Sequence, residues 1–176
     1  MATGQYTRNS PAGAAIKPHT GPLIVAATLI GVGMGGFVDG IVLHQILQWH
    51  QMLSAKLPPD TLLNKEVNMF WDGIFHAFTW LTTAVGIGLL WRLIYRRDAA
   101  LSNRIFVGGL FFGFGLFNVV EGLIDHHLLK LHNVREISES QGLWNWGFIL
   151  VSLLMLAGSW LAIQKGRRDV HRQLPG

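Results

Sequence analysis

Four long apolar segments, separated by shorter polar links, dominate the pattern of hydrophobic and polar positions along the chain. They cover residues 23–47, 67–90, 105–131 and 143–163. A helix needs about 20 mainly apolar residues to cross the hydrocarbon core of a bilayer, and each segment is long enough. The pattern therefore predicts an all-α integral membrane protein in which four transmembrane helices form a bundle.

The composition supports a membrane protein. Of the 176 residues, 50% are hydrophobic and 14% are charged, whereas soluble proteins average about 25% charged residues. We expect a polar N-terminal tail at 1–20, a transmembrane domain at 21–165 and a basic C-terminal tail at 166–176. Residues 1–20 lack the charged start, apolar core and cleavage site of a signal peptide, so we expect this tail to be retained. The chain has no cysteine, which excludes disulfides and thiolate ligands.

The chain has a net charge of +4, and its basic residues are concentrated at particular positions. They cluster at Arg92, Arg96, Arg97 and Arg104, and again at Lys165, Arg167, Arg168 and Arg172. Cytoplasmic segments of membrane proteins carry the Lys and Arg excess. We therefore expect both termini to be cytoplasmic and the links at 51–66 and 133–142 to face the opposite side. The expected partner is the lipid bilayer and not nucleic acid, and homo-oligomerisation stays open.

A polar motif occurs twice inside the apolar segments, with an offset of 82 residues. Both copies follow the pattern [Asp/Glu]-Gly-x3-His-x5-His, and they comprise Asp39, Gly40, His44 and His50, and Glu121, Gly122, His126 and His132. Ionisable groups in a membrane helix cost about 2.5 to 3.5 kcal/mol each on insertion scales, so they indicate function. The repetition predicts a bundle made of two related helix pairs.

The 67–90 segment adds Asp72 and His76, which stand four residues apart and share one helix face. A rise of about 1.5 Å per residue allows the depth of each polar group to be compared. It predicts two layers near the outer membrane surface. The upper layer contains His44, Asp72, Asp125 and His126, and the lower layer contains Asp39, His76 and Glu121.

Imidazoles with nearby carboxylates are a common ligand set for zinc and non-haem iron. We expect a divalent transition metal, zinc or iron first, with copper(II) left open because imidazoles also suit it. The expected metal ligands are His44, His76 and His126, followed by Asp72 and Asp125. Asp39 and Glu121 are expected to be the catalytic groups, as proton-handling bases, or to ligate or orient the imidazoles.

Structural pairing is the alternative to a metal. An Asp39–His126 or Glu121–His44 pair would satisfy both partners without an ion. At 100° per residue, Asp39 and His44 lie about 140° apart, on the two borders of a glycine seam. His50 and His132 are expected to be rim residues with no ligand role, and His127 a surface residue.

The 143–163 segment carries no histidine or carboxylate. Its Asn145, Ser152 and Ser159 recur every seven residues, a spacing typical of hydrogen bonding between helices in a left-handed bundle. We expect this helix to support the packing of the bundle.

Three runs of sequence carry a resemblance to a known family. They are GGFVDGIVLHQILQWH at 35–50, FWDGIFH at 70–76 and EGLIDHH at 121–127. Together the runs resemble a family of small bacterial four-helix membrane proteins of unknown function, over about residues 20–165. The resemblance implies a bacterial inner-membrane location and an association with the assembly of respiratory oxidases, hence with respiratory-chain membrane proteins.

Three functions are compatible with these patterns. A metal-dependent membrane enzyme would use the ion to activate water or oxygen, whereas a metal-handling or oxidase-assembly factor would load and release it. A b-type haem electron-transfer protein would use His44 and His126 as axial ligands. The sequence does not choose among them, and whether the protein is an enzyme stays open.

Overall fold

The computed structural model describes residues 19–96 and 98–172. Within these residues the helices are α1 (Gly21–Phe37) with its π-helical continuation η1 (Val38–Ile46), α2 (Leu62–Ile94), α3 (Asn103–Glu121) with its π-helical continuation η2 (Gly122–Leu128), and α4 (Gln141–Arg172). The four resulting rods are long and apolar enough to cross a membrane. The predicted all-α fold with four spanning helices is confirmed.

The structure describes only part of the two predicted tails. α4 continues to Arg172, so the first part of the segment expected as a tail from residue 166 is helical. Residues 1–18 and 173–176, which make up most of the rest of the two expected tails, lie outside the described residues, as does Arg97.

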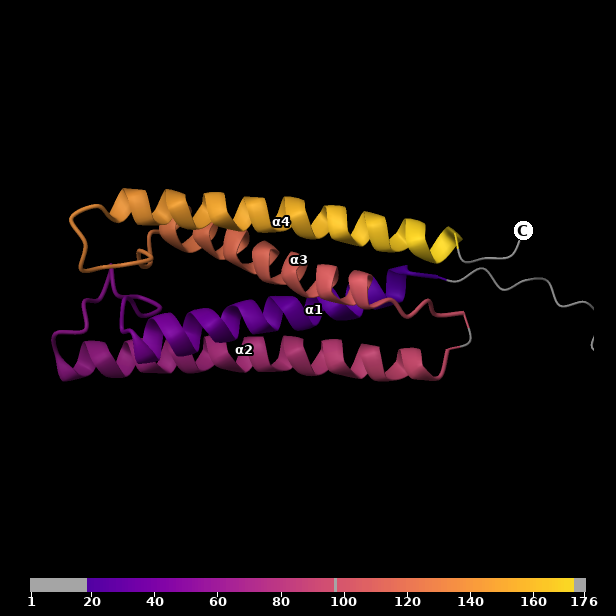
Figure 1. Cartoon of the computed structure of the whole chain (residues 1–176). Helices are drawn as coiled ribbons and strands as arrows, with labels where there is room; N and C mark the ends of the chain where they lie inside the picture. The colour runs from indigo at the N-terminus through magenta and orange to yellow at the C-terminus, as the bar shows by residue number, and fades with distance from the viewer. Residues whose placement is uncertain (1–18, 97, 173–176) are drawn as a thin grey trace, which may run out of the picture.

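α1 and α3 form the centre of the bundle, and the other two helices flank them. α2 packs along α1, and α4 packs along α3 (Figure 1). The links between η1 and α2 and between η2 and α4 lie together at one end, and the link between α2 and α3 lies at the other. The layer order α2, α1, α3, α4 therefore places the ends of η1 and η2 side by side, next to two links.

Gly31 and Gly113 bring the backbones of α1 and α3 into contact. A Cβ atom added at Gly31 would overlap the carbonyl oxygen of Leu110, and one added at Gly113 would overlap the carbonyl oxygen of Thr28. Small residues allow such close approach between membrane helices. The two glycines occupy equivalent positions, 82 residues apart, so each helix uses the same place to meet the other.

The outer helices expose large apolar side chains and bury small polar ones. Trp80, Leu154 and Leu161 are 64%, 65% and 66% exposed, while Thr79 and Ser152 are buried. Soluble proteins show the opposite arrangement, with large apolar side chains buried. Exposed apolar side chains therefore fit a bundle surrounded by lipid. The Ser152 and Ser159 hydroxyls donate to carbonyls of their own helix, Phe148 O and Met155 O respectively. The expectation that they bond across helices is therefore wrong, because the carbonyl one turn back is the nearer acceptor.

The η1–α2 link and the η2–α4 link are tied to each other. The Ala55 amide donates to Leu131 O, and the Glu136 amide donates to Trp49 O, each at 2.9 Å. The guanidinium of Arg135 lies 5.4 Å from the Trp49 ring and 5.6 Å from the Trp144 ring, which is within cation–π range. The links thus form one joined cap over the ends of η1 and η2.

Replacing Gly113 with valine tests the contact between α1 and α3. The added side chain must push the backbones apart, and such overpacking costs about 1 to 3 kcal/mol. We expect Gly113→Val to lower the midpoint of unfolding in a detergent titration followed by circular dichroism. Gly158→Val is the matched control, since a Cβ there meets no atom within 4 Å. Equal midpoints for the two variants would contradict the close packing.

Candidate metal centre

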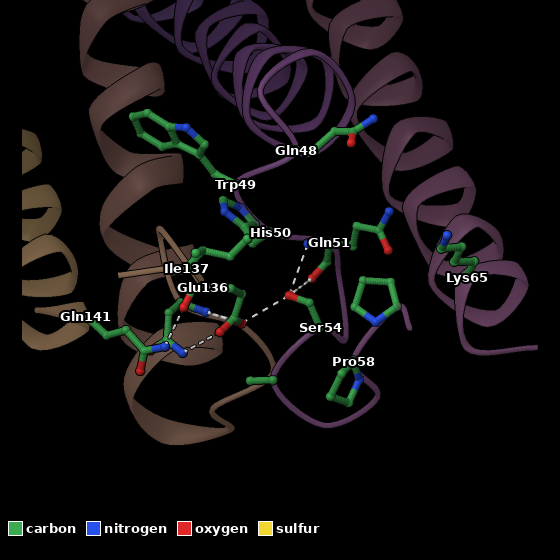
Figure 2. Close-up of a pocket in the computed structure, with 13 residues that line it drawn as sticks. Gln48, Trp49, His50, Gln51, Ser54, Pro58, Lys65, Glu136, Ile137 and Gln141 are labelled. Atoms are coloured by element: carbon green, nitrogen blue, oxygen red, sulfur yellow. Dashed lines mark hydrogen bonds between the residues drawn. The ribbon is translucent and has the colours of Figure 1, made fainter. Parts of the chain in front are cut away.

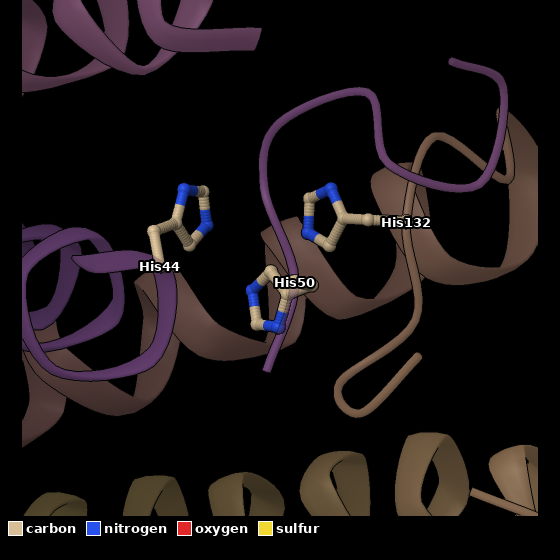
Figure 3. A group of neighbouring side chains, drawn as sticks. All are labelled: His44, His50 and His132. Carbon is tan, nitrogen blue, oxygen red and sulfur yellow. The ribbon is translucent and has the colours of Figure 1, made fainter. Parts of the chain in front are cut away.

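The two copies of the repeated motif meet where η1 and η2 end beneath the cap of links. All four imidazoles are buried, with His132 the least exposed at 1% and His126 the most exposed at 4%. The carboxylates of Asp39 and Glu121 are buried with them. Two groups of three residues have ligand atoms within 4.8 Å of one another: His44, His50 and His132, and Glu121, His126 and His132. Figure 3 shows the first group.

The π-helical segments explain how each carboxylate meets the histidine five residues later. In η1 and η2 the hydrogen bonds run from residue i to residue i+5, which brings residues five apart onto one side. Asp39 Oδ2 lies 3.0 Å from His44 Nε2, and Glu121 Oε1 lies 2.8 Å from His126 Nε2. The expectation that Asp39 and His44 stand 140° apart is wrong, because it assumed α-helical winding throughout.

A left-handed residue turns the second histidine of each copy inward. Gln48 has φ 52° and Lys130 has φ 51°, and these are the positive-φ non-glycine residues among those described. A left-handed residue ends a helix and redirects the chain. His50 and His132 follow two residues later and point back into the bundle (Figure 3). The expectation that they are rim residues is therefore wrong.

The carboxylate–imidazole contacts run within each copy of the motif. Asp39 Oδ1 lies 3.4 Å from His50 Nε2, and Glu121 Oε1 lies 3.0 Å from His132 Nε2. With the contacts to His44 and His126, each carboxylate touches both histidines of its own copy. The cross-copy pairs Asp39–His126 and Glu121–His44 are not among these contacts.

The imidazole rings connect the two copies. His50 and His132 stack with centroids 4.5 Å apart and planes 2° from parallel. The rings of His44 and His50 are 4.5 Å apart, and those of His126 and His132 are 4.9 Å apart. Four imidazoles and two carboxylates thus form one continuous cluster, which we call the His/carboxylate cluster.

Three of the four imidazoles are oriented through their other ring nitrogen. His50 Nδ1 donates to Val134 O at 2.8 Å, and His132 Nδ1 donates to Met52 O at 3.1 Å, so each histidine is held by the opposite link. His44 Nδ1 lies 3.0 Å from Asp72 Oδ1. Metal-bound histidines almost always make such a bond to a carbonyl or carboxylate.

These bonds leave unprotonated nitrogens facing carboxylates. A carbonyl oxygen only accepts, so Nδ1 of His50 and of His132 must carry a hydrogen, and in the neutral ring Nε2 is then a lone pair. A lone pair facing a carboxylate oxygen is repulsive unless a cation, either a proton or a metal ion, lies between them. Among the described residues, most buried side-chain atoms without a hydrogen-bond partner gather in this cluster, which also points to a cation: His44 Nε2, His50 Nε2, both nitrogens of His126, and Glu121 Oε2. Outside the cluster, His76 Nε2 and Gln51 Oε1 also have none.

The two link histidines differ in pKa. Burial lowers the pKa of His50, and the opposing attraction of the Asp39 carboxylate does not compensate. Burial also acts to lower the pKa of His132, but its hydrogen bond to Glu121 and the negative charge of that carboxylate raise the pKa overall.

The outer helices hold the links in place through buried polar side chains. Asp72 accepts from the Met52 amide at 2.9 Å as well as bonding His44. Asn68 accepts from the Leu53 amide at 2.9 Å, and on the other side Asn145 accepts from the Val134 amide at 3.0 Å. Sequence reasoning missed Asn68, whose one signal was an amide side chain one turn before Asp72.

Three of the predicted ligands lie outside the cluster: Asp72, which bonds His44 from α2, and His76 and Asp125. His76 is half-buried, its Nδ1 donates to Asp72 O at 2.7 Å, and a Cβ at Gly40 would lie 2.6 Å from its Nε2. Asp125 is half-buried beside Glu121 and faces an apolar groove. The predicted surface residue His127 is half-buried against Trp146, with ring centroids 4.5 Å apart, and also stands outside the cluster.

A polar cavity of about 650 Å³ lies among the links and reaches His50. Its walls include Gln51, Ser54, Glu136 and Gln141 (Figure 2). The Ser54 hydroxyl donates to Glu136 Oε1 at 3.0 Å across this cavity. The cluster can therefore be approached by water or ions from the end of the bundle that the links cap.

Comparisons with known proteins agree with the membrane architecture. Comparisons with curated proteins and with solved structures give no match. A family described as "Predicted membrane protein (DUF2243)" matches residues 26–166, a range that includes most of the first and fourth apolar rods, all of the second and third, and both copies of the motif. The chain belongs to this family of predicted membrane proteins, whose function is unknown.

Proposed function

We propose that the protein is a metal-dependent membrane enzyme whose His/carboxylate cluster holds two transition-metal ions. Each copy of the motif would bind one ion through two histidines and one carboxylate. The first set is Asp39, His44 and His50, and the second is Glu121, His126 and His132. The observation that carries the proposal is the row of imidazole nitrogens that face carboxylates with their other nitrogen already bonded.

The energetics favour metal ions over simple pairing. Buried charges and unpaired polar groups cost several kcal/mol unless they are compensated. A metal ion coordinated by His44 Nε2, His50 Nε2 and an Asp39 oxygen would compensate all three atoms at once. Two ligand atoms about 2.0 to 2.2 Å from one zinc ion lie roughly 3.3 Å apart in a tetrahedral site. The distances from Asp39 Oδ2 to His44 Nε2, 3.0 Å, and from Asp39 Oδ1 to His50 Nε2, 3.4 Å, are close to that separation.

The ligand count supports an open coordination position. Two histidines and one carboxylate are the protein ligands of hydrolytic zinc sites and of non-haem iron oxygenases, which leave room for water or substrate. Zinc and iron are therefore the metals we favour, and copper(II) is the alternative. Bound there, such an ion would activate water or oxygen as a Lewis acid or redox centre.

Asp72 takes a different role in this proposal from the one predicted. Its carboxylate bonds His44 Nδ1 and the Met52 amide, so it fixes the ring that would bind the metal and the link above it. His76 and Asp125 have no ligand role in the centre. Asp39 and Glu121 serve as ligands, and Glu121 Oε2, which has no hydrogen-bond partner, is the carboxylate oxygen that could move a proton.

A metal-handling factor is the second candidate function. The cavity of about 650 Å³ beside His50 favours it, because that cavity offers ions a path to the cluster. The enzyme is the better account because the ligands are almost fully buried and clamped by the cap of links, which favours a resident ion over an exchanging one.

A b-type haem does not fit the cluster. A porphyrin between His44 and His126 would have to displace His50 and His132. The ring centroid of His50 lies 4.5 Å from that of His44, and the ring centroid of His132 lies 4.9 Å from that of His126. No electron-transfer step through haem is proposed.

The proposed location is the bacterial inner membrane with both termini in the cytoplasm. Arg92, Arg96 and Arg104 lie at the end of the bundle opposite the cluster, as do the basic residues at the end of α4. The centre would then lie near the periplasmic surface. The association with respiratory-oxidase assembly and homo-oligomerisation stay predictions.

Metal content is the direct test of the centre. We expect the wild type, purified without metal-affinity steps, to contain about two ions per chain, since six ligand groups divide into two sets of three. His44→Ala or His126→Ala should leave one ion or fewer, and the double variant none. Elemental mass spectrometry on folded, monodisperse protein gives the ratio.

His76→Ala and His127→Ala are the matched controls, because both remove an imidazole near the cluster without removing a ligand. They should keep the wild-type metal content. Equal content in the wild type and the His44, His50, His126 and His132 variants would sink the proposal and leave hydrogen bonding as the role of these histidines.

Removing Asp72 tests its orienting role. We expect Asp72→Ala to retain both ions at saturating metal but to weaken affinity by about 10 to 100-fold, the usual effect of losing a group that orients a ligand. Competition with a chelator of known affinity measures the change. A loss of one whole ion at saturating metal would show instead that Asp72 is a ligand.

Cysteine labelling tests the orientation. The chain has no native cysteine, so Ala55→Cys and Ser138→Cys each provide a single thiol in the links. In whole cells a membrane-impermeant maleimide should label both. If labelling requires permeabilised cells, the centre faces the cytoplasm and the proposed orientation is wrong.

A further inference from the structure

An apolar groove of about 340 Å³ runs along the bundle to the His/carboxylate cluster. It is formed by α1, α2, α3 and η2, and it is lined by Val32, Phe75, Phe78, Leu116, Phe117, Val120, Ile124, Glu121 and Asp125. All of these residues belong to segments able to span the membrane. The groove is therefore separate from the polar cavity among the links, and lipid is what surrounds it.

Glu121 belongs to both the groove and the cluster. Its Oε1 contacts His126 and His132, while its Oε2 is buried and has no hydrogen-bond partner. Asp125 lies one turn further along and lines the same groove. Two carboxylates thus stand in a groove whose other walls are apolar.

Phe75 joins the groove to the first histidine of the cluster. Its ring stacks on the His44 ring, with centroids 5.8 Å apart and planes 23° from parallel. The centroid of the Phe117 ring also lies 5.8 Å from that of Phe75. Phe75 lines the groove as well. A molecule in the groove would therefore lie against the residues that touch both sets of ligands.

We infer that the substrate of the centre is a membrane-soluble amphiphile, with an apolar chain and a hydroxyl-bearing head, that enters from the bilayer through this groove. The inference rests on the proposed function. An ionised carboxylate only accepts hydrogen bonds, so the free Glu121 Oε2 and the Asp125 carboxylate call for a head that donates. The aromatic and aliphatic walls fit the chain.

The size of the groove agrees with this substrate class. Small-molecule sites range from about 300 to 1,000 Å³, so the groove holds the head and the first part of a chain while the rest stays in lipid. The polar cavity on the other side of the cluster supplies water or ions. Two separate approaches, one from lipid and one from the aqueous side, would meet at the centre.

The probe for this inference is dodecanol carrying a photoreactive diazirine, compared with diazirine-bearing dodecane, in nanodiscs containing the metal-loaded full chain. We expect the alcohol to label Phe75, Phe78 and Val120 several-fold more than Leu154 and Leu161 on α4, which are more exposed, as mapped by mass spectrometry. The alkane should label both regions alike. Val120→Trp, which fills the groove, should lower the groove labelling several-fold and leave the metal content unchanged.

Two further variants complete the test. Leu154→Trp places the same side chain on α4 outside the groove and should leave the labelling pattern unaltered. Asp125→Ala should reduce the preference for alcohol over alkane, since it removes one of the two acceptors. In cobalt-substituted protein, dodecanol should change the visible spectrum of the metal, and Val120→Trp should abolish that change.

The outcomes separate the two proposals. Equal labelling of groove and α4 by the alcohol, or a cobalt spectrum that dodecanol leaves unchanged, overturns the inferred substrate class even if the metal is present. If the wild type contains no metal, the proposed function is wrong whatever the labelling shows. The inferred substrate, which rests on that function, is then wrong as well.

Discussion

Direct backbone contact between α1 and α3 is the constraint on which the rest of the structure depends. Gly31 and Gly113 let each helix rest on the carbonyl groups of the other. Only because these two helices are adjacent do the copies of the motif that they carry meet at one end. The outer helices α2 and α4 then pack mainly against one long helix each, and they supply lipid-facing surface and the polar side chains that hold the links.

Burying ionisable groups within a membrane protein costs free energy. Several features of the fold hold the cluster in place despite that cost. Two π-helical segments align each carboxylate with its first histidine. Two left-handed residues, Gln48 and Lys130, return the second histidine of each copy to the interior. The bonds from His50 and His132 to the opposite links then fix both rings. Such costs are expected where buried ionisable groups serve a function.

Sequence reasoning succeeded where hydrophobicity and the position along the helix axis decide the outcome. The four spans and the shared region of Asp39, His44, Glu121 and His126 followed from hydrophobicity, the 82-residue offset and a constant rise per residue. It failed where the direction of a side chain around the helix axis decides the outcome. His50 and His132 were expected at the rim because the residue types do not predict a π-helical segment followed by a left-handed residue. It is this backbone geometry that turns both side chains inward. His76 was expected in the site because depth was predicted but the side-chain direction was not.

Anomalous diffraction at the absorption edge of the bound metal, on crystals of the full chain, tests the central claim most directly. The account predicts two peaks inside the cluster, one among Asp39, His44 and His50 and the other among Glu121, His126 and His132, each about 2.0 to 2.2 Å from its nitrogen and oxygen ligands. Metal-loaded crystals with no peak between these residues, or with a peak at His76 or His127 instead, would contradict it.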